Sequence, residues 1–551
     1  MDESDDALHE ILNKKISRRE ALSVGAKIGI AAGIGLVVGF AGGYLGGVAS
    51  APQKTVTKTV TAPKFLTKQI AIGVTDKVTD LDPSNAYDFY TWEVLNNVME
   101  GLVKYKQGTL EIIPALAESW ETKDAKNWTF HLRKGLKFAD GTPLTAKDVV
   151  RSVNRVIKIS GDPSWLVKSF VESVEAPDDY TVVFHLKSPV AYFLSLLITP
   201  PYFPVSPKYK PEEIDSDQTA GGDGPYMISE FVRDEVLSLK ANPNYYGESP
   251  YTENVIVKFY RDASTMRLAL ENGEIDIAWR TLRPTDIEYF KKSENFKVVE
   301  IPGSFIRYVC LSMKLDPTKN KLVRQALAAA VNRSEINELV FRGTVSHLYS
   351  MVPNGMWSHK DVFKKYGDAN LEMAKSLLKE AGYSEANPVE LELWYTPTHY
   401  GDTEADLAQV LKSEWEATGM IKVNVKSAEW GTYVDYARKG TMMAYLLGWY
   451  PDYLDPDDYT TPFLHSEANS WTGTYYSNPE VDELLTEAQS VVDQSERAKI
   501  YEQVQDILAE DVPYIPLIQG KLFMVTRPEV KGIIVGPDML VHYNSIYKAP
   551  S

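Results

Sequence analysis

A long run without charge near the start of the chain constrains its fold more than any other feature. No Asp, Glu, Lys or Arg occurs from Ile28 to Gln53, which reads IGIAAGIGLVVGFAGGYLGGVASAPQ. Because a helix rises about 1.5 Å per residue, this run can cross a hydrocarbon core of roughly 30 Å. We therefore expect a signal or anchor helix over residues 28–50. The basic residues that precede it, which favour a cytoplasmic N-terminus, are Lys14, Lys15, Arg18 and Arg19.

The segments on either side of this helix are predicted to lie on opposite sides of the membrane. Residues 1–27 are predicted to form a short, charged cytoplasmic tail. Residues 51–65 include PQKTVTKTVTAPK, a Thr-rich stretch bounded by prolines, and predict a stalk that holds a domain away from a surface. We thus expect the bulk of the chain to lie on the extracytoplasmic face of the cell membrane, anchored by its N-terminal helix.

Two export routes with cleavage are the alternatives to an uncleaved anchor. A secretory signal has an apolar core of only about 7–15 residues, but Ala49-Ser50-Ala51 offers a small-residue cleavage site before Pro52. The segment SRREAL, residues 17–22, resembles a twin-arginine export signal. We favour the uncleaved anchor. With cleavage the protein would be secreted, and all three routes place its folded part outside the cytoplasm.

Helix and strand signals alternate along the rest of the chain and indicate an α/β fold. Thr145 followed by Asp148 predicts a capped helix start, and Asn478 before Pro479 predicts another. Ser495 is the predicted N-cap of a further helix. A chain of 551 residues is long enough to divide into lobes.

Composition and motifs exclude several classes of function. A net charge of −17 argues against a nucleic-acid partner, because phosphate binding needs a basic surface. Cys310 is the only cysteine, so neither an intrachain disulfide nor a cysteine-rich metal cluster can form. The eight histidines are scattered, and phosphate-loop, nucleophile-elbow and zinc-helix motifs are absent. We expect no catalytic residue, no metal and no cofactor.

The stretch GWYPDYLDPDDY, residues 448–459, follows an apolar run and concentrates acids and aromatic rings. Its carboxylates do not have the spacing of an EF-hand, so calcium is not expected. A glycosidase uses a carboxylate pair, but a chain with 75 acidic residues always offers one. From these residues alone, both a capped strand-to-helix loop and a binding loop are open.

Segments from residue 66 to the C-terminus resemble the family 5 solute-binding proteins, the receptors of oligopeptide, dipeptide and nickel ABC importers. The hallmark segment is WTFHLRKGLKFADGTPLTAKDVVRSVNRV, residues 128–156. GGDGPYMISEF, NPNYYG, LVRQALAAAVNRSEI, EWGTY and GWYPDYLDP follow in the family's order. The resemblance implies a two-lobed periplasmic-binding-protein fold (type II, cluster C-like) with an extra subdomain.

The resemblance also implies domain boundaries. The chain is expected to pass from the first lobe to the second and back through hinge crossings near 305–313 and 512–520, with the ligand enclosed between the lobes. The implied parts are lobe I at 66–313 plus 521–551, with an inserted subdomain at about 86–215, and lobe II at 314–520.

In peptide-binding members of the family, the Asp of a Gly-Trp-x-x-Asp segment holds the α-ammonium of the ligand, which implies this role for Asp452. A carboxylate that meets an ammonium makes a charge-assisted hydrogen bond. Asp455, Asp457 and Asp458 are predicted to be turn and cap residues and not ligand contacts. The other ligand-binding residues that we predict are Trp449, Tyr450, Trp430, Tyr433, His399, Tyr90 and Trp471.

The chain departs from the family at one position that matters for the ligand. Dipeptide-type members hold the ligand carboxylate with an Arg shortly after the Trp that corresponds to Trp394. No Arg or Lys occurs here between Trp394 and Lys412, and His399 is the nearest replacement. Longer peptides need no such clamp, and neither do oligosaccharides, on whose rings the tryptophans could stack.

We therefore predict an extracytoplasmic receptor that captures peptides between two lobes and delivers them to the permease subunits of an ABC transporter. An oligosaccharide receptor of the same family is the alternative. A secreted hydrolase belongs to another class, and a turnover assay separates it from a receptor. A sensor ectodomain is less favoured, because residues 1–27 are too few for a signalling domain.

Overall fold

The computed structural model describes residues 65–280, 282–397, 399–400 and 403–550. The predicted tail 1–27, the anchor helix 28–50 and residues 51–64 of the stalk lie outside these residues. Among the helices that are described, none is both long and apolar enough to span a membrane.

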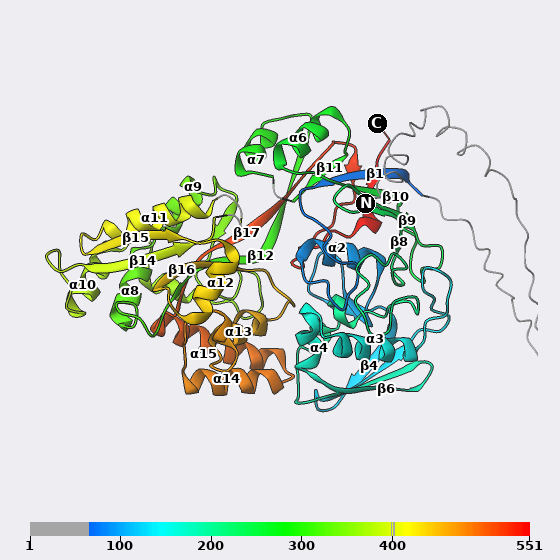
Figure 1. The fold of residues 1–551 in the computed structure, drawn as a ribbon, viewed down its shortest axis with the longest axis horizontal. Helices are drawn as coiled ribbons and strands as arrows, with labels where there is room; N and C mark the ends of the chain where they lie inside the picture. The colour runs from blue at the N-terminus through cyan, green and yellow to red at the C-terminus, as the bar shows by residue number, and fades with distance from the viewer. Residues whose placement is uncertain (1–64, 281, 398, 401–402, 551) are drawn as a thin grey trace, which may run out of the picture. The chain divides into compact units, whose positions relative to one another are not determined.

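A large mixed sheet runs through the described chain, in the order β15-β14-β16-β12-β17-β11-β1-β10-β9-β8, with β13 paired to β17 (Figure 1). Its strands are β1 (Thr67–Val74), β8 (Tyr226–Val232), β9 (Val236–Ala241), β10 (Thr252–Phe259), β11 (Ile277–Trp279), β12 (Lys297–Leu311), β13 (Val345–His347), β14 (Val389–Tyr395), β15 (Ile421–Ser427), β16 (Ala444–Trp449) and β17 (Tyr514–Thr526).

The antiparallel strands β12 and β17 join the two halves of this sheet. Strand β12 pairs with β17 on both sides of a register shift. The end of β17 also pairs with β11, whereas the second part of β12, from Ile306 to Leu311, also pairs with β16. The register shifts between Pro302 and Ile306, where the pairing changes from one half to the other. Gly303 and Gly520 meet at this point, since a Cβ on Gly303 would overlap with the carbonyl oxygen of Gly520. Both strands thus change partners at one place in the sheet.

The half of the sheet that contains β1 is covered by its own helices and carries a second, smaller sheet. Buried side chains of β1, β10 and α2 share one apolar core, and those of β5, β7 and α3 form another. The helices are α2 (Phe89–Val98), α3 (Ala146–Ile159), α4 (Trp165–Lys168), α5 (Phe193–Leu196), α6 (Ala263–Asn272) and α7 (Pro284–Lys291). The smaller sheet consists of β4 (Ala117–Thr122), β5 (Asn127–Leu132), β7 (Thr181–Leu186) and β6 (Val171–Asp178), in that order. Two further pairs are β2 (Val103–Tyr105) with β3 (Ile112–Pro114), and β18 (Val530–Lys531) with β19 (Tyr547–Lys548).

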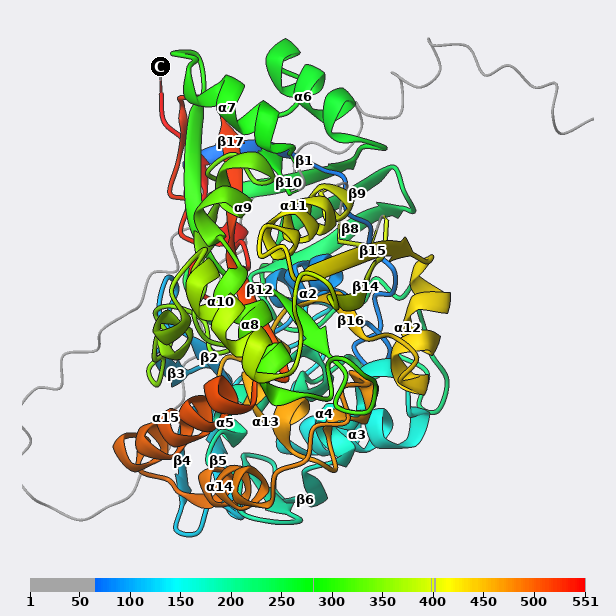
Figure 2. The same cartoon turned by 90° about the vertical axis from the view of Figure 1, so that its left-hand side faces the viewer.

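The half that contains β14 to β16 is built around one large apolar core, and Cys310 lies buried in it. Helices α8 and α10 pack side by side over this half (Figure 2). Its helices are α8 (Lys321–Ala330), α9 (Arg333–Leu339), α10 (Leu371–Glu380), α11 (Glu404–Glu416), α12 (Trp430–Lys439), α13 (Thr461–Leu464), α14 (Pro479–Ser490) and α15 (Gln494–Asp511).

Two of the predicted helix starts are confirmed and one is wrong by two residues. Asp148 accepts from the backbone N–H of Thr145 at 2.9 Å, and Asn478 caps α14. Helix α15 begins after Asp493 and not after the predicted Ser495, because the Asp493 carboxylate accepts the backbone N–H groups of Ser495 and Glu496. A carboxylate earlier in the chain therefore takes the capping role from the serine.

Candidate functional site

Three of the four acids in the loop after β16 serve the loop itself. Asp455 forms a two-pronged ion pair with Arg497, at 2.7 and 3.0 Å, and accepts the backbone N–H of Asp457. The carboxylate of Asp457 accepts the hydroxyl of Tyr453 at 2.7 Å. Asp458 Oδ2 lies 3.0 Å from the backbone nitrogen of Asp452. These carboxylates hold the turn in one conformation, in keeping with the predicted turn and cap roles.

Asp452 is the remaining acid of the loop and lies half-buried. Its Oδ2 accepts the hydroxyl of Tyr87 at 3.1 Å. Burial raises the pKa of Asp452 above its ordinary value. The pKa of the fully buried Asp458 is raised further, by burial first and then by the charge of Asp452. The two carboxylates therefore share a site in which a single proton, or a cation, is favoured.

No positive charge of the described chain neutralises this pair. None of the ion pairs among the described residues involves Asp452 or Asp458. Oδ1 of Asp458 is buried and has no hydrogen-bond partner among those residues. Leaving a buried acceptor unpaired costs about 1–3 kcal/mol. An ammonium group from outside the chain would supply the missing donor and the missing charge.

Two of the predicted tryptophans lie together behind this loop. Trp449, at the end of β16, donates its indole N–H to Asp458 Oδ2 at 3.1 Å. The ring of Trp471 lies 5.2 Å from that of Trp449, and its N–H donates to the carbonyl of Pro462. Both are half-buried. Their polar edges are used within the protein, so only their ring faces are available to a ligand.

Trp430 and His399 form a second aromatic group. Their rings stack at 3.6 Å and within 4° of parallel. The ring of Tyr400 meets both at steep angles. Burial, and then the charge of Arg307, lowers the pKa of His399 to about 4. His399 is therefore neutral at pH 7, which removes it as a cationic replacement for the missing arginine.

Two predicted site residues lie in apolar cores. Tyr433 is fully buried beneath Trp430, and its hydroxyl lies 2.7 Å from the carbonyl oxygen of Leu446. Tyr90 is buried among the side chains of the other half, and its hydroxyl lies 3.4 Å from that of Tyr543. Neither tyrosine is among the residues that line the two cavities described below, and a ligand-binding role for them stays a prediction.

Tyr450, the last predicted residue, lines a cavity of about 250 Å³ that the sequence did not reveal. Its ring stacks on Phe305 at 4.8 Å and within 10° of parallel. The described walls of this cavity hold no acid, although the chain is strongly acidic. Its cationic side chains are Arg280, Arg283, Arg307 and Lys521.

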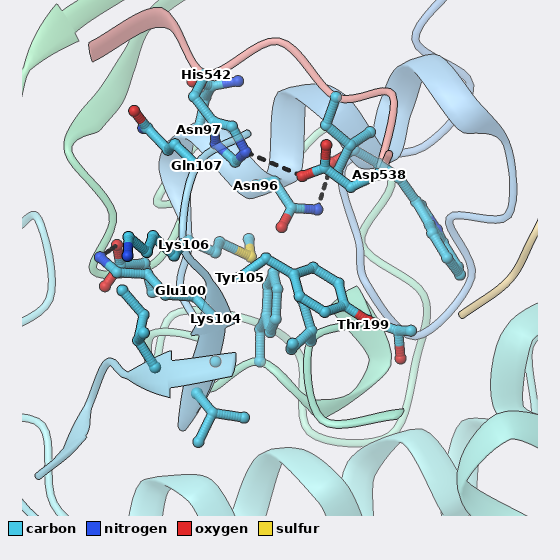
Figure 3. A pocket seen from close by; sticks show the side chains of 18 of the residues that line it. Asn96, Asn97, Glu100, Lys104, Tyr105, Lys106, Gln107, Thr199, Asp538 and His542 are labelled. Carbon is cyan, nitrogen blue, oxygen red and sulfur yellow. Dashed lines mark hydrogen bonds and ion pairs between the residues drawn. The ribbon is translucent and has the colours of Figure 1, made fainter. Parts of the chain in front are cut away.

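A larger cavity, of about 430 Å³, lies on another side of the same loop, and Asp452 and its neighbours are among its lining residues. Figure 3 shows Glu100, Lys104, Asp538 and His542 around this cavity. Most of its charges are already paired with one another. Lys104 lies 2.8 Å from Glu100, and His542 lies 3.2 Å from Asp538. These pairs neutralise one another, whereas Asp452, which also lines this cavity, has no ion-pair partner among the described residues. No group of His, Cys, Asp and Glu that could hold a metal occurs within the described ranges.

Known proteins of similar sequence and fold indicate the family of this chain. The dipeptide-binding protein of Escherichia coli is 30% identical over 477 residues, which cover 81% of this chain and 88% of that protein. Heme-binding protein A of Haemophilus influenzae is 31% identical over a region that covers 80% of this chain and 85% of that protein. The solved structure of the DppA periplasmic binding protein of Helicobacter pylori, in complex with the peptide STSA, is 26% identical and superposes with a TM-score of 0.72, covering 87% of this chain and 98% of that one.

The family assignment settles three predictions made from the sequence. Residues 111–471 match the family described as bacterial extracellular solute-binding proteins, family 5. The periplasmic-binding-protein fold is confirmed by the solved relatives, and a binding function in place of catalysis is confirmed by the family. The relatives also confirm an extracytoplasmic class of protein. This chain belongs to the family 5 extracellular solute-binding proteins.

Proposed function

We propose that this protein is the peptide receptor of an ABC importer, and that Asp452, backed by Asp458, holds the α-ammonium of the peptide. The observation that carries the proposal is the pair of carboxylates, Asp452 half-buried and Asp458 buried, that no cation of the described chain neutralises. Several relatives are named for dipeptides or were solved with a bound peptide, which supports this ligand class.

Aromatic residues around the carboxylates favour a peptide ligand, because their rings can pack against its side chains. Trp449, Trp471 and Trp430 present ring faces whose edges are fixed by contacts within the protein. Rigid rings lose little conformational freedom when a ligand packs against them. The same faces suit sugar rings, so an oligosaccharide is the second candidate ligand.

The two halves of the sheet act, in this proposal, as lobes that close on the ligand. Lobe I comprises 66–313 and 521–551, and lobe II comprises 314–520. The strands β12 and β17 carry the two crossings, and the register shift between Pro302 and Ile306 supplies a place where the pairing is interrupted. Small-angle scattering should report a smaller radius of gyration once a tight ligand is added, and an unchanged radius would contradict closure.

The proposal also includes a transport partner and a location for the receptor. The closed receptor docks on the permease subunits of an ABC transporter, and the helix predicted at 28–50 keeps the receptor on the extracytoplasmic face of the cell membrane. Both parts rest on family membership and on the uncharged run in the sequence.

Calorimetry with peptide and oligosaccharide panels tests the ligand class. We expect free peptides to bind and N-acetylated peptides to bind at least about 30-fold more weakly, because acetylation removes the ammonium. If oligosaccharides bind and no peptide binds, the peptide proposal is wrong and the protein is an oligosaccharide receptor.

A further inference from the structure

Tyrosine side chains cross between the two halves of the large sheet in both directions. Tyr453, in the loop after β16, is 5% exposed and lies in the core formed by side chains of β5, β7 and α3. Tyr105, at the end of β2, is buried in the large core of the half that contains β16. Each half thus supplies a ring to the apolar core of the other, and separating the halves would expose both rings to water.

The ring of Tyr453 is held from both halves. Tyr192, directly before α5, stacks on it with ring centres 5.3 Å apart and within 7° of parallel. The hydroxyl of Tyr453 donates to Asp457 at 2.7 Å. Cζ of Arg497, from α15, lies 5.6 Å from the ring centre of Tyr192, and the ion pair with Asp455 fixes that guanidinium. The loop after β16 therefore has a defined partner on the smaller sheet's side.

A backbone hydrogen bond lies beside this stack. The N–H of Ala191 donates to the carbonyl oxygen of Gln489 at 2.8 Å, and Figure 1 shows α14 next to the part of the chain that carries the smaller sheet. Gln489 lies in the last turn of α14, where carbonyl groups lack partners within the helix. The N–H of the preceding Val190 donates instead to the carbonyl of Ala125, within the smaller sheet's side. Two adjacent amides thus make bonds of different kinds, one between the halves and one inside a half.

Asp452 is tied to the same contact. It directly precedes Tyr453, so the insertion of that ring fixes one end of the peptide unit that carries the carboxylate. Its carboxylate accepts the hydroxyl of Tyr87, which belongs to the half that contains β1. Both contacts exist only while the two halves lie together. The position of the Asp452 carboxylate therefore depends on residues of the other half.

We infer that Tyr192 and Tyr453 form a latch between the two halves, and that this latch positions Asp452 for a ligand ammonium. The second part rests on the proposed peptide receptor. Tyr192 lines neither of the two cavities, so it acts through Tyr453 as a positioning residue. A ligand held by Asp452 and the latch stabilise the same arrangement of the halves. Loss of the latch lowers the fraction of protein that is competent to bind, and the apparent affinity falls by that fraction.

Hydrogen–deuterium exchange at single-residue resolution, on the ligand-free protein, tests the latch itself. Tyr453→Leu removes the stacked ring. We expect exchange of the Ala191 N–H to become about two- to tenfold faster, the size expected for the loss of one stacked aromatic pair. Exchange of the Val190 N–H should stay close to its wild-type rate, because its acceptor lies on its own side.

Phe184→Leu is the matched control for this measurement. Phe184 is buried in the same core as Tyr453. The rings that it contacts belong to the smaller sheet and the segments packed on it, namely those of Phe130, Phe193 and Tyr202. This variant makes a similar loss of packing away from the loop after β16, so the ratio of the Ala191 and Val190 exchange rates should remain that of the wild type.

Calorimetry with L-alanyl-L-phenylalanine tests the link to ligand binding. Tyr192→Leu should weaken binding about two- to tenfold, although Tyr192 lines neither cavity. Tyr192→Phe keeps the stacked ring, and Asp457 keeps the hydroxyls of Tyr453 and Thr461, so this variant should bind as the wild type does. Phe184→Leu should also bind as the wild type does.

The other outcomes separate the latch from the receptor. Equal acceleration of Ala191 and Val190 in Tyr453→Leu, or no acceleration of either, would refute the latch. Faster exchange of Ala191 together with unchanged affinity of Tyr192→Leu would refute the positioning of Asp452. If the wild type binds no member of the peptide panel, the receptor proposal is wrong, and the exchange measurement still decides whether the two tyrosines hold the halves together.

Discussion

The hydroxyl of Tyr87 donates to the carboxylate of Asp452 at 3.1 Å, although the two residues are 365 positions apart in the chain. Tyr87 immediately precedes α2 and its cap Asp88, and Asp452 follows β16. The contact joins the two halves of the sheet at the site where we place the peptide ammonium. Tyr87 in turn accepts the indole N–H of Trp165 at 3.3 Å, so its orientation is fixed from the other side.

Asp452→Asn should weaken a free dipeptide by about 2–5 kcal/mol, because the ligand ammonium would lose its counter-charge in a partly buried site. N-acetylation of the peptide should cost a similar amount on the wild type. The two changes together should cost less than their sum, since one interaction is lost only once. Calorimetry on this cycle measures the coupling, with Asp435→Asn, an exposed acid of α12, as the control. Full additivity would show that Asp452 serves only the loop.

Glu414 should make the protein less stable as the pH rises. Burial raises its pKa to about 8, its Oε2 accepts the backbone N–H of Asn332, and it is 6% exposed. A carboxyl whose folded pKa exceeds its unfolded value contributes fully below the unfolded pKa of 4.5. That contribution is lost as the pH rises toward the folded pKa, by on the order of 2–5 kcal/mol.

Urea denaturation from pH 5 to pH 9 measures this loss. Glu414→Gln keeps an acceptor oxygen but cannot ionise. The free energy of unfolding of this variant should therefore fall less than that of the wild type over the same pH range. Glu372→Gln, at an exposed position of α10, should follow the wild-type curve. Parallel curves for Glu414→Gln and wild type would contradict the assignment.

Gly520→Ala should reduce peptide affinity through the aromatic wall of the cationic cavity. A Cβ at Gly520 would overlap with the ring of Phe305, which stacks on Tyr450. Displacing that ring disturbs the loop that carries Asp452, and we expect at least a tenfold loss of affinity and a destabilisation of about 1–3 kcal/mol. Gly431→Ala is the control, because a Cβ there meets nothing within 4 Å and lies inside α12. It should stabilise by about 0.5–1 kcal/mol, and equal effects of the two substitutions would count against the packing argument.

The full-length protein should fractionate with membranes and resist extraction with alkaline carbonate, because residues 28–53 carry no charge. Mass spectrometry of the mature N-terminus provides the decisive measurement. A terminus near Pro52 would show that the segment is a cleaved signal, and export would still hold.

Local signals in the sequence were enough to determine two of the predicted helix starts and the alternation of helices and strands. Thr145 with Asp148, and Asn478 before Pro479, act within one turn of backbone, so their effect does not depend on the rest of the fold. Ser495 failed as a cap because Asp493, two residues earlier, offers a stronger acceptor to the same N–H groups. The order of the family's motifs likewise predicted the periplasmic-binding-protein fold from residue 66 onward.

The tertiary structure alone decided which side chains face a cavity. Tyr433 and Tyr90 are of a residue type that is common in binding sites, but both lie in apolar cores, because the packing of their helices turns them inward. Arg280, Arg307 and Tyr450 are distant in the sequence and meet only through the register of β11, β12 and β16. Long-range strand pairing carries no local signature, so the acids of one loop could be recognised from the sequence, whereas the arginines that line the cavity beside Tyr450 could not.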